Sequence, residues 1–219
     1  MKVHEKIKGL HVLTDRELAY PISLLKIMKL AISSGVSILQ LRDKNASFKE
    51  MVSLGKELQN LTKNSIPLIV NDNIDVALAL NAAGIHVGQN DTPAKKVRKI
   101  VGKKMILGVS VSSVSQAIKA QRDEADYVGA GPLFPTSSKP DAGQVLGLIG
   151  LKEIKMSIDI PVIAIGGITL DNVSEVAEIA DGIAVISAVL KADNPEKTVM
   201  DFVKIIKNAG GKKTYEKRS

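Results

Sequence analysis

The sequence predicts a single (β/α)8 barrel, the TIM-barrel class of α/β fold, on three observations. Short apolar segments alternate with longer amphipathic segments along the whole chain, as in parallel strands joined by helices. Eight such pairs occupy 219 residues, a length toward the lower end for this fold. The aromatic fraction is only 3%, and Ile, Val, Leu and Ala dominate the apolar residues, which is typical of strands buried on both faces.

We expect a strand wherever a short apolar run is bounded by turn residues. Glycines 35, 84 and 182 precede or open three of these runs. The predicted strands are residues 10–14, 36–41, 67–70, 85–87, 106–109, 127–129, 162–165 and 183–186.

We expect a helix after each strand, where apolar residues recur at helical spacing. Ser47 and Glu50 form a capping box at the start of one helix, and Thr92-Pro93 predicts an N-cap followed by proline at the first helical position. The predicted helices are residues 22–33, 47–63, 73–82, 94–101, 114–122, 148–156, 170–179 and 195–208.

The alternative architecture is a doubly wound open sheet. The barrel is favoured because the units stay regular to the end, and because Thr14-Asp-Arg-Glu, rather than a Gly-x-Gly-x-x-Gly loop, follows the first strand. Nothing resembles a linker between domains, so we expect residues 1–209 to form one catalytic domain. Residues 210–219 form a basic tail that carries +3 of the net charge of +7 and is expected to be disordered.

Composition excludes several classes of function. Without cysteine the chain has no disulfide, thiolate metal site or cysteine nucleophile, and its three histidines argue against zinc. No apolar run has transmembrane length and no signal-peptide core is present, so we expect a soluble, cytoplasmic protein without a membrane partner. The mild, dispersed positive charge and the scarcity of aromatic residues favour anionic small molecules over nucleic acid.

Active sites of parallel barrels lie where the carboxyl ends of the strands converge. After the sixth predicted strand, Thr136, Ser137, Ser138 and Lys139 place three hydroxyls and an ammonium in consecutive positions. These donors suit a phosphorylated ligand, although an ordinary solvated loop has the same composition. Gly166-Gly167 and Ser187 follow strands seven and eight, where phosphate sites recur in this fold; the alternative is a tight turn that needs glycine.

A second anion site is predicted after the second strand, where strand alternation places Gln40, Arg42 and Lys44 on one side. Asp72 and Asp91 follow the next two strands, and two clustered carboxylates with nearby cations suit Mg²⁺ and a diphosphate. Each aspartate alone is more readily explained as a helix N-cap, and the pair together with Arg42 and Lys44 favours a metal site. Two separate anion sites, one with metal, point to a transferase whose leaving group is diphosphate.

The remaining polar residues near strand ends receive structural interpretations. His11 and His86 lie within strands and are interpreted as packed or hydrogen-bonded core residues rather than catalytic bases. Asp15 is interpreted as a cap or loop residue.

Over nearly the whole barrel, the motifs at the strand ends resemble those of the thiamine phosphate synthase family. One departure is mild, since the usual Pro-Thr-x-Thr-Lys reads Pro-Thr-Ser-Ser-Lys here and Ser138 keeps the hydroxyl. The matching motifs are Gln40-Leu-Arg-Asp-Lys44, Asn71-Asp72, His86-Val-Gly-Gln-Asn-Asp91, Gly108-Val-Ser110, Gly131-Pro-Leu-Phe-Pro-Thr-Ser-Ser-Lys139, Ala164-Ile-Gly-Gly-Ile168 and Ala180-Asp-Gly-Ile-Ala-Val-Ile-Ser187.

The resemblance implies that 4-amino-2-methyl-5-hydroxymethylpyrimidine diphosphate condenses with a thiazole phosphate, or its carboxylated form, to give thiamine phosphate and diphosphate. It implies Mg²⁺ at Asp72 and Asp91 and catalytic roles for Arg42, Ser110 and Lys139. The residues implied to bind the pyrimidine diphosphate are Gln40, Leu41, Arg42, Asp43, Lys44, Asn71, Ser110 and Lys139. Those implied to bind the thiazole phosphate are Thr136, Ser137, Ser138, Gly167, Ile186 and Ser187.

Two other functions fit the same fold. A thiazole tautomerase, an isomerase, would be expected to lack the Gly-Gln-x-Asp metal motif, which this chain keeps. A non-catalytic phosphate-binding barrel would need only the site after strands seven and eight, which leaves Asp72, Asp91 and the basic residues unexplained. The sequence leaves the oligomeric state open, and a homo-oligomer is compatible with it.

Overall fold

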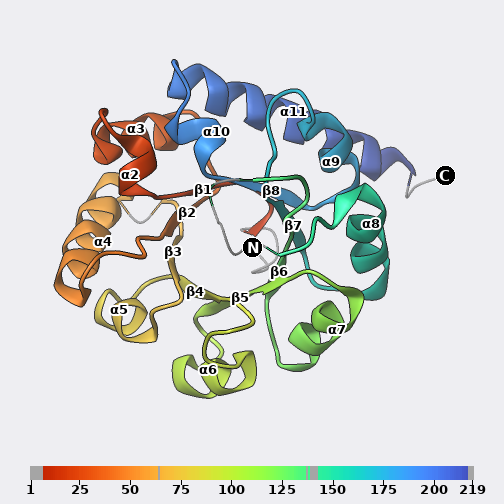
Figure 1. The fold of residues 1–219 in the computed structure, drawn as a ribbon, viewed down its shortest axis with the longest axis horizontal. Coiled ribbons are helices and arrows are strands. Elements are labelled where there is room, and N and C mark those ends of the chain that lie inside the picture. The colour runs from red at the N-terminus through yellow and green to blue at the C-terminus, as the bar shows by residue number, and fades with distance from the viewer. Residues whose placement is uncertain (1–6, 64, 137, 139–142, 217–219) are drawn as a thin grey trace.

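The computed structural model describes residues 7–63, 65–136, 138 and 143–216 and shows a closed barrel of parallel strands (Figure 1). Each strand pairs with the next, and β8 closes the barrel on β1. The strands are β1 Gly9–Leu13, β2 Ile38–Leu41, β3 Leu68–Asn71, β4 Gly84–Val87, β5 Ile106–Val111, β6 Tyr127–Ala130, β7 Val162–Ile165 and β8 Gly182–Val185. The predicted fold class and all eight predicted strands are confirmed, with ends that differ by a few residues at most.

Helices form a ring around the barrel (Figure 1). The eight predicted helices are present: α3 Leu24–Ser33, α4 Phe48–Thr62, α5 Ile74–Ala79, α6 Ala94–Val101, α7 Val114–Arg122, α8 Gly147–Ser157, α9 Val173–Ile179 and α11 Pro195–Glu216. Two further four-residue helices, α2 Arg16–Ala19 and α10 Ser187–Leu190, follow β1 and β8. A single turn is too short to produce a periodic apolar pattern, which is why periodicity predicted neither of them.

Two apolar clusters fill the molecule, one on each side of the barrel wall. The larger cluster packs the outer faces of the strands against the helices. Successive side chains of a strand point to opposite faces, so every second side chain points into the barrel. These inward-pointing side chains form the smaller cluster, which fills the barrel interior. Its buried members are Ile7, Leu13, Ile38, Ile69, Ile106, Tyr127, Ile163 and Ala184. The barrel is therefore closed inside, and any ligand must bind at one of its ends.

The helix ends agree with the sequence at α4 and differ from it at α6 and α11. The capping box of Ser47 and Glu50 is confirmed. The predicted cap at Thr92 is wrong by one residue, since Pro93 is the N-cap of α6. Helix α11 continues to Glu216, so the structure differs from the expected disordered tail over residues 210–216, and residues 217–219 lie outside the described residues.

Within the residues that the structure describes, the helices are all too short or too polar to cross a membrane.

Candidate functional site

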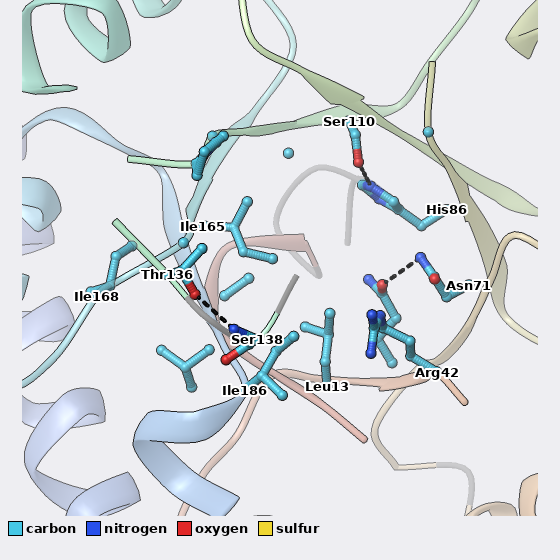
Figure 2. A pocket seen from close by; sticks show the side chains of 18 of the residues that line it. Leu13, Arg42, Asn71, His86, Ser110, Thr136, Ser138, Ile165, Ile168 and Ile186 are labelled. Carbon is cyan, nitrogen blue, oxygen red and sulfur yellow. Dashed lines mark hydrogen bonds between the residues drawn. The ribbon is translucent and has the colours of Figure 1, made fainter. Parts of the chain in front are cut away.

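A cavity of about 340 Å³ opens at the carboxyl ends of the strands (Figure 2). Every strand of the barrel contributes to its wall directly or through the loop that follows it. Most of the predicted site residues meet there: Gln40, Arg42, Lys44, Asn71, Asp72, Asp91, Ser110, Thr136, Ser138, Gly167, Ile186 and Ser187. Segments far apart in the sequence are thus brought to one place by the closure of the barrel.

Two of the predicted site residues that the structure describes, Leu41 and Asp43, are not among the lining residues. Leu41 is fully buried in the core between strands and helices, and Asp43 forms an ion pair with Arg16 of α2. Both side chains alternate with Gln40 and Arg42, which face the cavity, so the strand geometry turns them away from it. Ser137 and Lys139 lie outside the described residues.

On the β2–β3 side of the cavity, polar side chains are held in place by one another. Asn71 Nδ2 donates a hydrogen bond of 3.1 Å to Gln40 Oε1, and Gln40 is only 4% exposed (Figure 2). Arg42 is 7% exposed, and its Nη1 lies 3.0 Å from Asp15 Oδ2. A buried guanidinium needs such a partner, because burial of an unpaired charge is costly. This side therefore presents a fixed cation and amide groups to the cavity.

Thr14 and Asp15, at the end of β1, hold both the backbone and the side chain of Arg42. The buried Thr14 hydroxyl donates to the Arg42 carbonyl oxygen and accepts from the Arg42 N–H, both at 2.8 Å. Asp15 also accepts from Leu18 N as the N-cap of α2, which confirms its interpretation as a cap. The ion pair with Arg42 is a second contact that the sequence did not predict.

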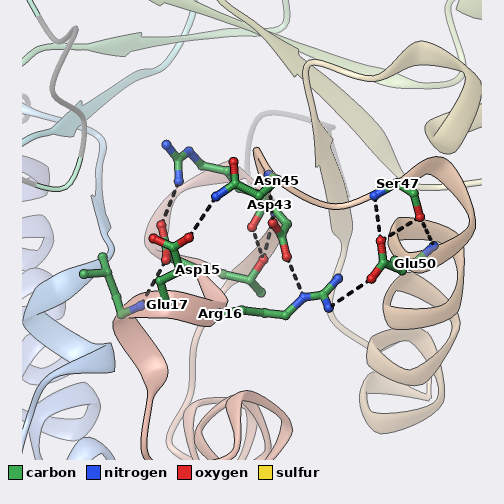
Figure 3. Close-up of polar contacts among 10 residues, drawn as sticks. Asp15, Arg16, Glu17, Asp43, Asn45, Ser47 and Glu50 are labelled. Atoms are coloured by element: carbon green, nitrogen blue, oxygen red, sulfur yellow. Dashed lines mark hydrogen bonds and ion pairs between the residues drawn. The ribbon is translucent and has the colours of Figure 1, made fainter.

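Further polar contacts tie α2 to the loop after β2 (Figure 3). Arg16 Nε lies 2.5 Å from Asp43 Oδ2, and Asn45 Nδ2 donates to Glu17 Oε1 at 2.8 Å. Arg16 also approaches Glu50, whose partner Ser47 caps α4. The hydrogen bonds that Glu50 accepts from Ser47 lower the pKa of Glu50. These contacts fix the segment that carries Arg42 between two helices.

Asp72 and Asp91 both line the cavity, as predicted for metal ligands. The alternative interpretation as N-caps is wrong, because Asn73 caps α5 and Pro93 caps α6. Asp91 Oδ2 accepts a hydrogen bond of 2.7 Å from Gly88 N, which fixes the carboxylate relative to the end of β4.

The carboxylates of Asp72 and Asp91 form a sparse donor set. Among the described residues, no cluster of three or more histidine, aspartate or glutamate side chains is placed to hold a metal ion. Two oxygen donors fit a hard cation such as Mg²⁺, which takes its remaining ligands from water and substrate phosphates. They do not fit zinc, which needs three or four protein ligands rich in nitrogen or sulfur.

The opposite side of the cavity gathers hydroxyl groups (Figure 2). Ser138 Oγ donates to Ser187 Oγ at 3.1 Å, and Ser138 N donates to Thr136 Oγ1 at 3.3 Å. Ser187 is the first residue of α10, so its backbone N–H is one of the first amides of a helix, which have no intrahelical partner. This side offers several neutral donors, as a phosphate monoester requires.

Gly166 and Gly167, after β7, have positive φ angles of 98° and 66°. A Cβ at Gly166 would lie 2.7 Å from Pro132 Cα, and one at Gly167 would lie 2.6 Å from Pro135 O. The tight-turn interpretation of these glycines therefore holds sterically. It does not compete with a ligand role, because the same close packing places both residues on the cavity wall beside the loop after β6.

Both described histidines are hydrogen-bonded and buried, as predicted. His11 Nε2 lies 2.6 Å from the Ile7 carbonyl oxygen, and burial lowers the pKa of His11 to about 4 against the opposing effect of that bond. His86 is 7% exposed and contacts Tyr127 and Ser110. His86 also lines the cavity, a position that the prediction did not include.

Three residues that hold other site residues in place were not predicted from the sequence, because they have no recognised site role of their own. Thr14 and Asp15 hold Arg42, and Gln89 Nε2 donates to the Ser110 carbonyl oxygen at 2.6 Å. Gln89 lies inside the Gly88–Asp91 segment, so its position after a strand was the available signal. Thr14 and Asp15 also follow a strand, but this position did not identify their partner, which is 28 and 27 residues away in the chain.

Comparisons with known proteins agree with these motifs. The thiamine-phosphate synthase of Roseiflexus castenholzii is 52% identical over 188 residues, which cover 85% of this chain and 82% of that protein. The thiamine-phosphate synthase of Clostridium tetani is 48% identical over 190 residues, 86% of this chain and 90% of that protein.

A solved structure and a family model extend the agreement to the fold. The thiamine phosphate pyrophosphorylase from Pyrococcus furiosus has a TM-score of 0.84 and 41% identity, covering 92% of this chain and 96% of that one. The family model for thiamine monophosphate synthase matches residues 10–189, which include all eight strands except the first residue of β1. From these matches and the site described above, it follows that the chain belongs to the thiamine monophosphate synthase family.

Proposed function

We propose that the protein joins 4-amino-2-methyl-5-hydroxymethylpyrimidine diphosphate to 4-methyl-5-(2-phosphoethyl)thiazole, or its carboxylated form, and releases diphosphate, together with CO2 when the thiazole is carboxylated. One observation carries the proposal: a single cavity has two polar sides of different chemistry. Arg42, Lys44 and two carboxylates stand on one side, and hydroxyl groups stand on the other. A diphosphate with a cation suits the first side, and a phosphate monoester suits the second.

The proposed chemistry needs stabilisation of a leaving group more than a general base. The bond between the pyrimidine methylene carbon and the diphosphate oxygen breaks, and its electron pair leaves with diphosphate. The thiazole nitrogen then donates its lone pair to that carbon, which forms the new C–N bond. Arg42 and Ser110 line the cavity, and both are proposed to stabilise the developing negative charge on the diphosphate. Lys139 is proposed to act with them on the strength of its motif alone.

Substrate orientation is proposed to come from the uncharged residues. Gln40 and Asn71 are linked to each other and expose amide groups to the cavity beside Arg42. They would hold the pyrimidine side, while Thr136, Ser138, Ser187 and the glycine turn at Gly167 would hold the thiazole phosphate. Bringing the two reacting atoms together in this way lowers the barrier through proximity.

Asp72 and Asp91 are the residues proposed to hold Mg²⁺. When bound, the ion would neutralise part of the charge on the diphosphate. Neither rival function uses this pair, since the isomerisation releases no diphosphate and a binding module needs no metal.

The decisive experiment measures diphosphate release with both substrates and Mg²⁺, with either substrate alone, and with EDTA. We expect release only when both substrates and the metal are present. Diphosphate-free conversion of a thiazole compound would favour the tautomerase instead. Absence of diphosphate release under all of these conditions would exclude the proposed synthase activity.

The metal role of Asp91 is tested with Asp91→Asn, because asparagine keeps an oxygen acceptor for Gly88 N while losing the charge. We expect this variant to need a higher Mg²⁺ concentration for half-maximal rate. As a matched control, Asp75→Asn changes a charge in the first turn of α5 and should leave the Mg²⁺ requirement unaltered. An unchanged requirement in Asp91→Asn would exclude Asp91 as a ligand.

A further inference from the structure

Behind Ser110, a chain of hydrogen bonds leads from the cavity wall into the barrel interior. His86 Nε2 lies 2.9 Å from Ser110 Oγ (Figure 2), and His86 Nδ1 lies 2.9 Å from the Tyr127 hydroxyl. Tyr127 is 1% exposed and belongs to the interior apolar cluster. These two hydrogen bonds therefore connect the Ser110 hydroxyl at the cavity wall, through His86, to the buried Tyr127 phenol.

Two glycines in the barrel wall leave room for the side chains of His86 and Tyr127. A Cβ at Gly108 would lie 2.2 Å from Tyr127 Cζ and 2.4 Å from His86 Nδ1. A Cβ at Gly129 would lie 3.0 Å from His86 Cε1. Two neighbouring strands, β5 and β6, thus carry glycine where the imidazole and the phenol meet.

The direction of the hydrogen bonds follows from the buried phenol. Burial raises the pKa of Tyr127, with a smaller contribution from the charge of Asp126, so the phenol keeps its proton. Within the described part of the chain, His86 Nδ1 is the acceptor available to that proton. A buried O–H without an acceptor is costly, so Nδ1 must accept and the ring proton must be on Nε2.

This tautomer decides what Ser110 offers to a ligand. His86 Nε2–H donates to Ser110 Oγ, so the serine proton points away from His86. Ser110 lines the cavity, and among the described residues its hydroxyl has no second partner. Its proton is therefore available to a ligand atom that accepts.

We propose that Tyr127 and His86 are positioning residues that fix Ser110 as a hydrogen-bond donor to an oxygen of the pyrimidine diphosphate. This inference rests on the proposed function for the identity of the ligand. The opposite tautomer would turn the serine proton toward His86 and leave a lone pair facing an anion whose charge grows as the C–O bond breaks. A fixed donor instead stabilises that charge without reorganisation.

The first test measures the His86 tautomer in the free protein by ¹⁵N NMR of the imidazole. The chain has three histidines, so the His86 signals are assigned by their loss in His86→Gln. We expect an unprotonated Nδ1 and a protonated Nε2 in the wild type. A protonated Nδ1 would overturn the proposal. This measurement needs no substrate, so its result is independent of whether the proposed synthase reaction is correct.

The second test is a double-mutant cycle with Tyr127→Phe, Ser110→Ala and the pair. We expect each single variant to lower kcat/KM for the pyrimidine diphosphate by about tenfold or more, as for loss of one well-oriented hydrogen bond to a charged group. Since Tyr127 is proposed to act through Ser110, the pair should be no slower than Ser110→Ala. Losses that multiply in the pair would show that Tyr127 has only a structural role.

The KM for thiazole phosphate serves as the internal control, and we expect it to stay within about twofold in both single variants, because the hydroxyl side of the cavity is not altered. A rise equal to that for the pyrimidine diphosphate would indicate general damage to the barrel and contradict the proposal. If Tyr127→Phe fails to fold, as judged by circular dichroism, the wild-type ¹⁵N spectrum decides alone.

Discussion

At the scale of single residues, Arg42 shows how a candidate site residue depends on partners far away in the sequence. Its backbone is fixed by Thr14 and its guanidinium by Asp15. Strand alternation predicted that Arg42 faces the cavity, as the structure confirms. The identity of its partners depends on the pairing of β1 with β2, which places Leu13 opposite Gln40.

We predict that Asp15→Asn lowers kcat by about tenfold, equivalent to ~1.4 kcal/mol of transition-state stabilisation. Asparagine can still cap α2, so the substitution removes the charged partner of Arg42 and leaves the helix start intact. The measurement is steady-state kinetics with both substrates.

Glu17→Gln is the matched control for Asp15→Asn. Glu17 lies on the same short helix, is exposed, and bonds Asn45 rather than Arg42. We expect this variant to retain the wild-type kcat. Equal losses in both variants would mean that the net charge of α2 matters, rather than the contact with Arg42.

At the scale of elements, periodicity located the strands and the longer helices, because burial of one face imposes a repeat on the sequence. It did not locate α2 and α10, because four residues are too few to repeat an apolar pattern. A tight turn that needs glycine was the alternative interpretation of the segment after β7, and the structure supplies a reason for it: the loop after β6 packs directly against this turn.

Comparison of Gly167→Ala, in the turn after β7, with Gly147→Ala, at the start of α8, separates the effect of backbone strain from that of steric overlap. Both glycines have a φ of 66°, but a Cβ at Gly167 would lie 2.6 Å from Pro135 O, whereas one at Gly147 would meet nothing within 4 Å among the described atoms. We expect Gly147→Ala to lower the free energy of unfolding by about 1–2 kcal/mol, the cost of a left-handed alanine.

We expect Gly167→Ala to cost a further ~1–3 kcal/mol, because the new methyl group overlaps the neighbouring loop. Urea unfolding of the two variants and the wild type gives both values. Equal losses at the two positions would show that the loop after β6 moves aside freely and does not hold the turn.

At the scale of the whole molecule, the buried and uncharged His11 makes the stability of the fold depend on pH. His11 is fully buried, and burial lowers its pKa from 6.5 to about 4. The unfolded chain binds a proton at His11 below about pH 6.5, whereas the folded protein does so only near pH 4. The stabilising contribution is therefore complete above pH 6.5 and is lost as the pH falls from 6.5 toward 4.

We predict that this group makes the free energy of unfolding fall by at most about 3 kcal/mol between pH 7 and pH 4. His11→Gln is the comparison, because the amide does not titrate and keeps a donor for the Ile7 carbonyl oxygen. Urea unfolding at several pH values should show a shallower pH dependence in the variant. Parallel curves for the two proteins would contradict the assignment.

The sequence by itself determined the fold class, the order of strands and helices, and most of the residues that meet at the strand ends. It could do so because strand alternation and helical periodicity are local, and because the barrel brings every strand end to one face. The tertiary structure decided which neighbours share a hydrogen bond: Thr14 and Asp15 with Arg42, and His86 with both Tyr127 and Ser110. These contacts join strands that the sequence separates, so the barrel pairing had to be known before the donor at Ser110 could be assigned.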